Sequence, residues 1–292
     1  MFKGAITAIV TPFKEDESLD EEALRGLVNF QLKNKIDGIV PCGTTGESPT
    51  LDHEEHHKVI EIVIDAVNGR VPVIAGTGSN STKEAINLTK KAADAGANAS
   101  LQVCPYYNKP TQEGLFRHFS AIAKAVDIPI IVYNIKGRTG INMETVTLAR
   151  LAKEHSNIVA VKEASGDINQ MKDVLNTLPK EFDVLSGDDK MAIPLMEAGG
   201  RGVISVAGNI IPNEMHELTQ YALNGDFEKA KEMHNKLLPL FEGLFIETNP
   251  VPIKAALAMK GMIKEVYRLP MCEMKLENKE KLKKILTDFK LI

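Results

Sequence analysis

The chain has 292 residues, of which 43% are hydrophobic and 25% charged, a balance typical of globular proteins. Its net charge of -4 does not favour nucleic acids or anionic membranes as partners, and the low aromatic content argues against base-stacking platforms. No apolar run is long enough to span a bilayer, and the N-terminal stretch, broken by Pro12, is too short for a signal peptide.

Short apolar runs alternate with amphipathic segments along most of the chain. The predicted strands are Ala5–Val10, Gly38–Pro41, Val71–Ala75, Ser100–Cys104, Ile128–Tyr133, Ile158–Lys162, Asp183–Ser186 and Gly202–Val206. Alternation of strand and helix implies parallel strands joined by right-handed crossovers. Eight such units close into a (β/α)8 barrel, so the fold class is α/β.

The intervening helices have recognisable ends. Asp52 with Glu55, and Ser81 with Glu84, have the spacing of capping boxes. From about Pro212 the pattern becomes wholly helical. We therefore expect residues 1–224 to form the barrel with the active site and residues 225–292 to form a C-terminal helical region.

Lys162 ends the sixth predicted strand, in the run Ile158–Ala164. A run this rich in Val and Ile indicates a strand buried on both faces. A buried ammonium is costly unless it is paired or loses its proton, and a neutral lysine amine forms imines with carbonyl compounds. The alternatives are a structural ion pair or a strand-end lysine whose head reaches water.

Other polar residues also follow the ends of strands, where barrel enzymes place their active sites. They are Gly43–Glu47 after the second strand, Tyr106 and Tyr107 after the fourth, Tyr133 on the fifth, Ser186–Asp189 after the seventh, and Ile204 and Ser205 on the eighth. Because these ends meet at one face of a barrel, we expect the residues to share a pocket with Lys162.

Each of these residues has a chemical use. The glycine-flanked turn Gly43–Gly46 can direct N–H groups at a small carboxylate. Tyr133 can shuttle protons, and Arg138 can hold a second carboxylate. This set predicts an aldolase that joins a 2-oxo acid to another acid. We expect no cofactor, since the segment Gly76–Ser81 lacks the third glycine of a dinucleotide fingerprint.

Seven segments carry a more specific signal. They are GTTGES (43–48), YYNKPTQEG (106–114), YN and GRTG within 133–140, VKEASGD (161–167), LSGDD (185–189), GVISVAGN (202–209) and TNPVPIKAAL (248–257). With them the chain resembles the dihydrodipicolinate synthase family of pyruvate-dependent aldolases, which includes N-acetylneuraminate lyase. The segments span nearly the whole chain in order, so the resemblance rests on far more than one motif.

The resemblance implies a synthase of lysine and diaminopimelate biosynthesis. It would condense pyruvate with L-aspartate-4-semialdehyde through a lysine imine, giving 4-hydroxy-tetrahydrodipicolinate. The alternative is another pyruvate-dependent aldolase of the same fold, an N-acetylneuraminate or sugar-acid lyase. Arg138 within GRTG, together with Tyr107, favours the synthase over these lyases.

The resemblance also implies roles for single residues. The implied catalytic residues are Lys162 as the imine lysine and Tyr133, Thr44 and Tyr107 as a proton relay. The implied substrate-binding residues are Thr45, Gly187, Ile204 and Arg138, of which Thr45 and Ile204 contact pyruvate and Arg138 takes the semialdehyde carboxylate. Tyr107 would enter the site of a neighbouring subunit, so the resemblance implies a homotetramer built as a dimer of dimers.

One departure from the family pattern lies in the loop that carries Arg138. The family usually has proline where this chain has Lys136. Proline would restrict φ, so its loss should loosen the loop by about 0.4–1 kcal/mol through unfolded-state entropy. We expect this to affect substrate affinity more than the reaction itself.

The sequence His53-Glu54-Glu55-His56-His57 also matches H-E-x-x-H, the pattern of a zinc hydrolase using His53, Glu54 and His57. The pattern lies at the start of a predicted barrel helix, directly after Asp52, and no third ligand is evident downstream. We therefore predict no metal site. The other interpretations are a solvated helix start and a regulatory site.

The resemblance also implies a regulatory site, at residues that follow the second, third and fourth predicted strands. The feedback-sensitive family members bind lysine at the positions that correspond here to Ser48, Pro49, His53, His56, Asn80, Glu84 and Tyr106. Glu84 suits an ammonium group, whereas the alternative is that it only completes the Ser81 capping box. Pro49 departs from the small residue often found there.

The number and spacing of the cysteines indicate the redox state of the cellular compartment. Cys42, Cys104 and Cys272 are far apart and odd in number, which favours a reduced, cytoplasmic compartment over a disulfide framework.

Overall fold

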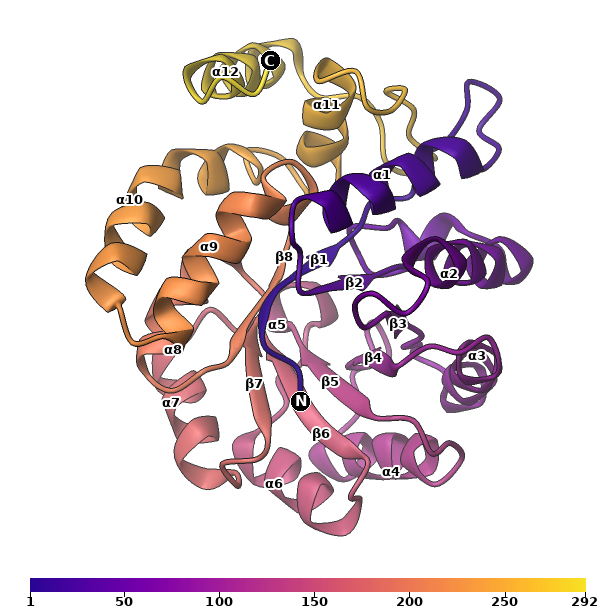
Figure 1. Ribbon diagram of the computed structural model, residues 1–292. Coiled ribbons are helices and arrows are strands. Elements are labelled where there is room, and N and C mark those ends of the chain that lie inside the picture. The colour runs from indigo at the N-terminus through magenta and orange to yellow at the C-terminus, as the bar shows by residue number, and fades with distance from the viewer.

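A computed structural model describes all of residues 1–292 and contains eight parallel strands arranged in a ring (Figure 1). The strands are β1 (Gly4–Ala8), β2 (Gly38–Val40), β3 (Ile74–Gly76), β4 (Ala99–Val103), β5 (Ile130–Asn134), β6 (Ile158–Glu163), β7 (Asp183–Ser186) and β8 (Gly202–Ser205). Their order is β2-β1-β8-β7-β6-β5-β4-β3. A parallel bridge between Ile39 and Val73 joins the two ends of this order, so the eight strands form the predicted barrel.

All eight predicted strands are present; β7 has the predicted bounds, and the boundaries of the others are shifted by one to three residues. The largest shift is in the third strand, which begins at Ile74 instead of Val71. Pro72 lies in the predicted part and has no N–H group to donate to a neighbouring strand. Its carbonyl oxygen instead accepts from Ile39 N at 3.0 Å, which helps to close the ring.

Helices surround the ring and alternate with the strands up to β8. They are α1 (Glu21–Lys33), α2 (His53–Val67), α3 (Thr82–Asp94), α4 (Gln112–Ala123), α5 (Lys136–Thr139), α6 (Thr145–Glu154), α7 (Ile168–Thr177), α8 (Ala192–Glu197) and α9 (Pro212–Leu223). Three short 3-10 helices, η1 (Ser48–Thr50), η2 (Asp189–Met191) and η3 (Ala207–Asn209), lie in the loops after β2, β7 and β8.

The two capping boxes predicted from the sequence have different outcomes. Asp52 accepts from the N–H groups of Glu54 and Glu55, and the Glu55 side chain accepts in return from Asp52 N, so this box is confirmed. Ser81 makes no side-chain cap, so the second box is wrong. Glu84 instead accepts from Ser79 Oγ and pairs with His53 Nε2 at 2.8 Å.

The barrel interior is filled by side chains from all eight strands. It includes Ile6, Ile74, Ile131, Leu185 and Ile204, each completely buried. Two further apolar layers lie between the strands and the surrounding helices. Each large apolar side chain buried in this way stabilises the fold by roughly 1.5–3 kcal/mol, which keeps the strand ends in place.

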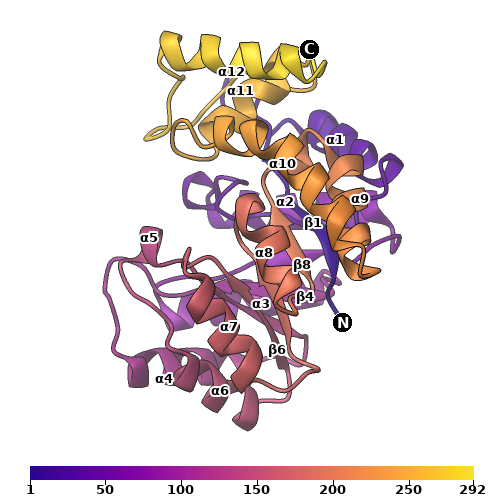
Figure 2. The same cartoon turned by 90° about the vertical axis from the view of Figure 1, so that its left-hand side faces the viewer.

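The end of the chain forms three more helices, α10 (Phe227–Gly243), α11 (Val251–Met259) and α12 (Leu276–Asp288). Helix α10 packs on α8 and α9, whereas α11 and α12 lie together beside the ring (Figures 1 and 2). A division of the chain near residue 224 stays a prediction. No helix has both the length and the apolar content needed to cross a membrane.

Candidate active site

The ammonium group of Lys162 and the ring of Tyr133 lie side by side inside the barrel. The two residues are paired across β5 and β6, so both side chains point to the same face of the sheet. Lys162 Nζ lies 4.2 Å from the centroid of the Tyr133 ring. The side chains are buried, with 6% and 5% of their residue surface exposed.

Burial changes the proton affinity of both groups. It lowers the pKa of Lys162 to about 7; the Asp189 carboxylate opposes this shift and the Arg138 guanidinium adds to it. Burial raises the pKa of Tyr133 to about 12, while Arg138 and the Thr44 hydroxyl act in the opposite direction. Near neutral pH the site therefore combines a partly neutral amine with a protonated phenol. A neutral amine is nucleophilic, and a phenol can donate a proton.

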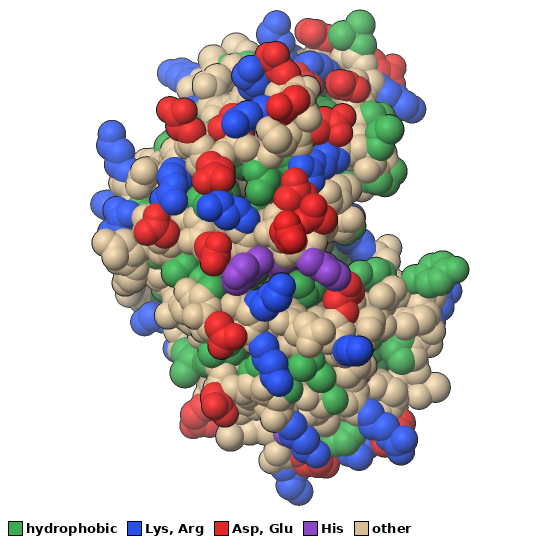
Figure 3. Space-filling view, turned by 90° about the vertical axis from the view of Figure 1, so that its right-hand side faces the viewer, with side chains coloured by type: hydrophobic (Ala, Val, Ile, Leu, Met, Phe, Trp, Pro, Cys, Tyr) green, Lys and Arg blue, Asp and Glu red, His purple; other side chains and the backbone are tan.

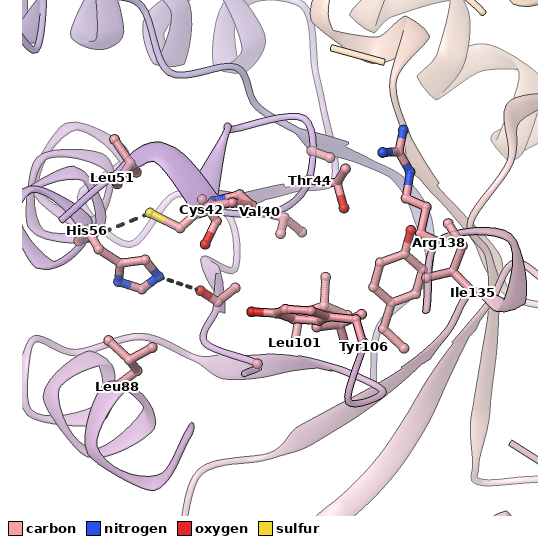
Figure 4. Close-up of a pocket in the computed structure, with 18 of the residues that line it drawn as sticks. Val40, Cys42, Thr44, Leu51, His56, Leu88, Leu101, Tyr106, Ile135 and Arg138 are labelled. Carbon is pink, nitrogen blue, oxygen red and sulfur yellow. Dashed lines mark hydrogen bonds between the residues drawn. The ribbon is translucent and has the colours of Figure 1, made fainter. Parts of the chain in front are cut away.

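Both residues line one wall of a cavity of about 470 Å³ at the C-terminal ends of the strands. Thr44 from the loop after β2 and Arg138 from α5 line the same part (Figure 4). Figure 4 shows Arg138 and Thr44 on one side of the cavity and His56 and Leu88 on the other. The structure thus brings together four predicted site residues: Lys162 and Tyr133 from neighbouring strands, Thr44 from a loop and Arg138 from α5.

Three further predicted residues support this wall without lining the cavity. Gly187 lies against Ala164 and Lys162: a Cβ atom there would lie 2.6 Å from Ala164 Cβ and 3.0 Å from Lys162 Cε, so a larger residue would force these neighbours to shift. Ile204 is completely buried in the barrel interior with Tyr133. Thr45 is buried as well, and its hydroxyl accepts a hydrogen bond from Asn249 Nδ2 at 3.1 Å.

The Arg138 guanidinium is anchored from the C-terminal part of the chain. Its Nη2 donates to the carbonyl oxygen of Asn249 at 2.9 Å. Asn249 lies two residues before the start of α11 and contacts both Thr45, in the loop after β2, and Arg138, in α5. A guanidinium held at one nitrogen keeps its other donors available for a carboxylate.

Tyr107 is the predicted catalytic residue that lies outside the cavity. It is 89% exposed, and its backbone is held at a positive φ of 73°. Within a single chain its hydroxyl therefore does not join Tyr133 and Thr44. Its neighbour Tyr106 does line the cavity (Figure 4).

Six of the seven predicted regulatory residues line the other part of the same cavity. They are Ser48, Pro49, His53, His56, Glu84 and Tyr106. The seventh, Asn80, lies beside them and donates to the carbonyl oxygen of Tyr106 at 3.2 Å. His56 is buried and donates from Nε2 to the carbonyl oxygen of Gly76 at 2.9 Å (Figure 4).

In the part of the cavity lined by the predicted regulatory residues, some charged side chains have partners of opposite charge. Hydrogen bonds from Ser79 and His53 hold the pKa of Glu84 below its ordinary value, so the carboxylate is ionised. Burial raises the pKa of Tyr106, which keeps its hydroxyl protonated. Figure 3 shows the side of the molecule that carries α2 and α3, where histidines lie among acidic and basic side chains. The electrostatics suit a small zwitterion better than a simple anion.

The two histidines of the H-E-x-x-H pattern have separate carboxylate partners. His53 pairs with Glu84, and His57 lies 3.2 Å from Glu61 on its own helix. No three His, Cys, Asp or Glu side chains converge in a way that could hold a metal ion. The arrangement of these side chains gives the zinc hydrolase alternative no support.

Sequence reasoning missed the contacts that residues far along the chain make with the site. Asn249 and Lys254 lie within TNPVPIKAAL, which marked the family resemblance but received no role. Asp189 was likewise part of LSGDD; it is buried, and its carboxylate accepts from Val206 N and Ala207 N at 3.0 and 2.9 Å. The signal was present in each case as a polar residue inside a family segment.

Comparisons with known proteins agree with this geometry. Residues 1–289 match the family model described as the dihydrodipicolinate synthetase family. A 4-hydroxy-tetrahydrodipicolinate synthase from Syntrophus aciditrophicus (strain SB) is 59% identical over 292 residues, which cover 100% of both chains. A dihydrodipicolinate synthase from Acinetobacter baumannii, solved with pyruvate, has a TM-score of 0.98 and 46% identity, with 100% of both chains covered. One from Cyanidioschyzon merolae, solved with lysine bound, has a TM-score of 0.97 and 42% identity over 100% of this chain and 99% of that one.

Proposed function

Because the chain belongs to the dihydrodipicolinate synthetase family, we propose that it carries out the family's condensation through an imine on Lys162. The chain is an enzyme that condenses pyruvate with L-aspartate-4-semialdehyde to 4-hydroxy-tetrahydrodipicolinate, a step of lysine and diaminopimelate biosynthesis. The high identity over full length supports this activity over that of an N-acetylneuraminate or sugar-acid lyase.

The observation that carries the proposed mechanism is the buried Lys162 beside Tyr133. The neutral Lys162 amine attacks the C2 carbonyl of pyruvate, and loss of water gives the imine. Removal of a proton from C3 then gives an enamine, whose C3 attacks the aldehyde carbon of the semialdehyde. The amino group of the second substrate finally attacks the imine carbon, which closes the ring and releases the Lys162 amine.

Proton transfer in these steps is assigned to Tyr133. Its phenol lies against Lys162 and is protonated near neutral pH, so it can protonate the leaving hydroxyl of the carbinolamine. Thr44 lies beside it and extends the relay toward the cavity mouth. Tyr107 of the partner subunit completes the relay in this proposal, and the high exposure of this residue in the single chain supports a role across an interface. We place the chain in a homotetramer, a dimer of dimers.

We assign the carboxylate groups of the two substrates to different parts of the site. The turn that carries Thr44 and Thr45 receives the pyruvate carboxylate, with Gly187 and Ile204 shaping the wall beside it. Arg138 receives the carboxylate of the semialdehyde, because its guanidinium lines the cavity and is already anchored at Asn249. The three cysteines are all free, which supports a reducing, cytoplasmic location.

The covalent step is tested by borohydride reduction in the presence of pyruvate. We expect one pyruvate to be trapped on the peptide that contains Lys162, and Lys162→Ala to abolish trapping. Arg138→Ala should leave trapping intact while weakening use of the semialdehyde. Trapping on a different lysine of the wild type would refute the mechanism, and loss of trapping in the Arg138 variant would refute the assignment of that residue.

We also propose that L-lysine inhibits the enzyme by binding in the second part of the cavity. Glu84 would receive its side-chain ammonium, while Asn80 and Tyr106 would hydrogen-bond its carboxylate. The pocket is continuous with the active site, so a bound ligand can influence the relay without touching pyruvate. A related synthase has been solved with lysine bound, which supports a lysine site in this family.

Steady-state rates measured against added L-lysine test this site. We expect inhibition of the wild type that Glu84→Ala relieves. Glu61→Ala is the matched control, because it also removes a carboxylate partner of an α2 histidine but lies outside the cavity. A wild type insensitive to lysine would contradict the proposal, and so would equal inhibition of the Glu84 variant.

A further inference from the structure

Glu47 and Lys254 form an ion pair that is closed off from solvent. Their side chains are 1% and 0% exposed, and Lys254 Nζ donates to Glu47 Oε1. The ammonium also lies 4.3 Å from the centroid of the Phe13 ring. The pair joins two residues that are 207 positions apart, one at the end of the Gly43–Glu47 turn and one in α11.

Stability alone is a poor explanation for such a pair. Taking two charges out of water costs about as much as their attraction returns, and apolar replacements of buried pairs are often as stable. Here Glu47 Oε2 has no hydrogen-bond partner, so the compensation is incomplete. Burial also lowers the pKa of Lys254, with the Glu47 carboxylate opposing the shift. The pair is therefore better explained by the geometry that it imposes.

The ion pair constrains the backbone conformation of the Gly43–Glu47 turn. Glu47 has a positive φ of 52°, a conformation that residues other than glycine seldom adopt without support. Its N–H donates to the carbonyl oxygen of Thr44 at 3.2 Å, and Thr11 Oγ1 donates to the carbonyl oxygen of Gly46 at 2.7 Å. The side chain of Glu47 is the only one in the turn that is tied by an ion pair to another element.

The segment that supplies Lys254 reaches the turn at a second point. Asn249 Nδ2 donates to Thr45 Oγ1, and the Asn249 carbonyl oxygen accepts from Arg138. The turn is thus held from the C-terminal part of the chain through Glu47 and through Thr45. Arg138 is held through a separate backbone contact, which does not involve the ion pair.

We propose that Glu47 and Lys254 are positioning residues, whose buried ion pair holds the Gly43–Glu47 turn so that Thr44 and Thr45 keep their orientation toward the pyruvate carboxylate and Tyr133. This inference rests on the proposed roles of Thr44 and Thr45. It assigns to α11, which lies outside the barrel, part of the geometry of the pyruvate site. It also predicts that the two substrates respond differently when the pair is removed.

The test is the double variant Glu47→Gln/Lys254→Met, which removes both charges and leaves no buried charge without a partner. We expect the pyruvate concentration for half-maximal borohydride trapping, and the KM for pyruvate, to rise about tenfold, the equivalent of one lost interaction of ordinary strength. The KM for the semialdehyde should change much less, because the contact between Arg138 and Asn249 remains. Trapping at saturating pyruvate should still label Lys162.

The matched control is Glu55→Gln/Arg268→Met. This pair also joins the C-terminal part to the barrel, through Arg268 Nη2 and Glu55 Oε1 at 2.6 Å. Arg268 also donates to the carbonyl oxygens of Glu17 and Thr50 and lies over the Phe13 ring, but none of its hydrogen bonds is to residues 43–47. The control should leave the KM for pyruvate unchanged even where stability falls. If the double variant of Glu47 and Lys254 does not fold, Glu47→Asp keeps both charges while shortening the side chain, and it should raise the KM for pyruvate in the same selective way.

Two results would overturn the inference while leaving the proposed function in place. One is an unchanged KM for pyruvate in folded variants of the pair, and the other is an equal rise for both substrates. Absence of trapping in the wild type would instead refute the imine mechanism, so the two failures are distinguishable.

Discussion

Lys162 and Lys254 are the two lysines that this fold buries. The regions around them differ in whether a carboxylate pairs with the lysine ammonium group. Lys162 is the last residue but one of β6 and makes no ion pair; the Asp189 carboxylate is the charge that favours its protonated form. Lys254 lies in α11 and contacts the Glu47 carboxylate directly. Burial lowers the pKa of both, but only Lys162 is left with an amine that is free to react.

The difference teaches that a buried lysine in a sequence does not by itself indicate a nucleophile. What matters is whether a carboxylate reaches the ammonium group, because a paired ammonium keeps its proton and its position. The same chain therefore uses one buried lysine for chemistry and, in our proposal, the other to hold the loop that receives the substrate.

The largest expected difference between the two regions is in activity. Lys162→Met should reduce the rate of synthesis by more than about a thousandfold, because no other group supplies the imine nitrogen. Its free energy of unfolding should stay unchanged or rise, since the substitution removes a buried amine that has no ion-pair partner. A coupled assay and urea unfolding measure the two effects. A large loss of stability would show that Lys162 is held by an interaction that the present contacts do not include.

The second difference is in stability. Lys254→Met should lower the free energy of unfolding by about 3–5 kcal/mol, because it leaves the Glu47 carboxylate buried and unpaired. Adding Glu47→Gln should restore most of that loss. Urea midpoints of the single and double variants provide the measurement. A double variant as unstable as the single one would mean that packing around α11, and not the unpaired charge, causes the effect.

The region around Lys162 should also make the free energy of unfolding depend on pH. Lys162 has a pKa of about 7 in the folded protein against an ordinary value of 10.5, so between these values the unfolded chain holds a proton that the native state lacks. The native state therefore gains stability from this group as the pH rises through that window, by at most about 1.4 kcal/mol per pH unit. Below the window both states hold the proton, and the contribution is constant.

The comparison that isolates this effect is between the wild type and Lys162→Met. The difference between their free energies of unfolding should change with pH in favour of the wild type from about pH 7 upward. Trapping at low pyruvate concentration should increase over the lower part of the same range, because the neutral amine reacts. A difference that does not change with pH would place the pKa of Lys162 near its ordinary value and weaken its proposed role.

The smallest expected effect concerns the loop beside Lys162 that carries Arg138. Lys136 is the first residue of α5, a position that suits proline, and Ile135 before it, with φ of -142° and ψ of 81°, lies outside the α region that a following proline disfavours. Lys136→Pro should therefore raise the free energy of unfolding by about 0.4–1 kcal/mol. Lys136→Ala controls for loss of the charge, and equal stability of the two variants would argue against a role for backbone restriction.

Much of the fold could be predicted because its signals are local. Alternating apolar runs and helical segments indicated eight strands, and the rule that barrel strands present their C-terminal ends to one face placed Lys162 near Tyr133. Neighbouring strands in the chain are neighbours in this ring, so these two residues meet across β5 and β6. The confirmed capping box at Asp52 is likewise a contact within a few residues.

Most of the omissions involve partners that are distant in sequence. Glu84 was expected to complete a box with Ser81, but it is bound by Ser79, five residues before it, and by His53 from another helix. The contacts of Asn249 with Thr45 and Arg138 join segments that are 204 and 111 positions apart. Residue type and spacing do not specify such contacts, because closing a long loop depends on how the whole barrel packs and not on local propensity.

By itself, the sequence determined the order of strands and helices, the end of the barrel at which the site lies, and the family. Only the tertiary structure decided which buried lysine keeps a carboxylate partner. Glu47 and Lys254 meet because the turn after β2 and helix α11 pack together, whereas no carboxylate forms an ion pair with the end of β6. The reactivity of a lysine depends on the distance to the nearest opposite charge, and that distance is a property of the folded chain.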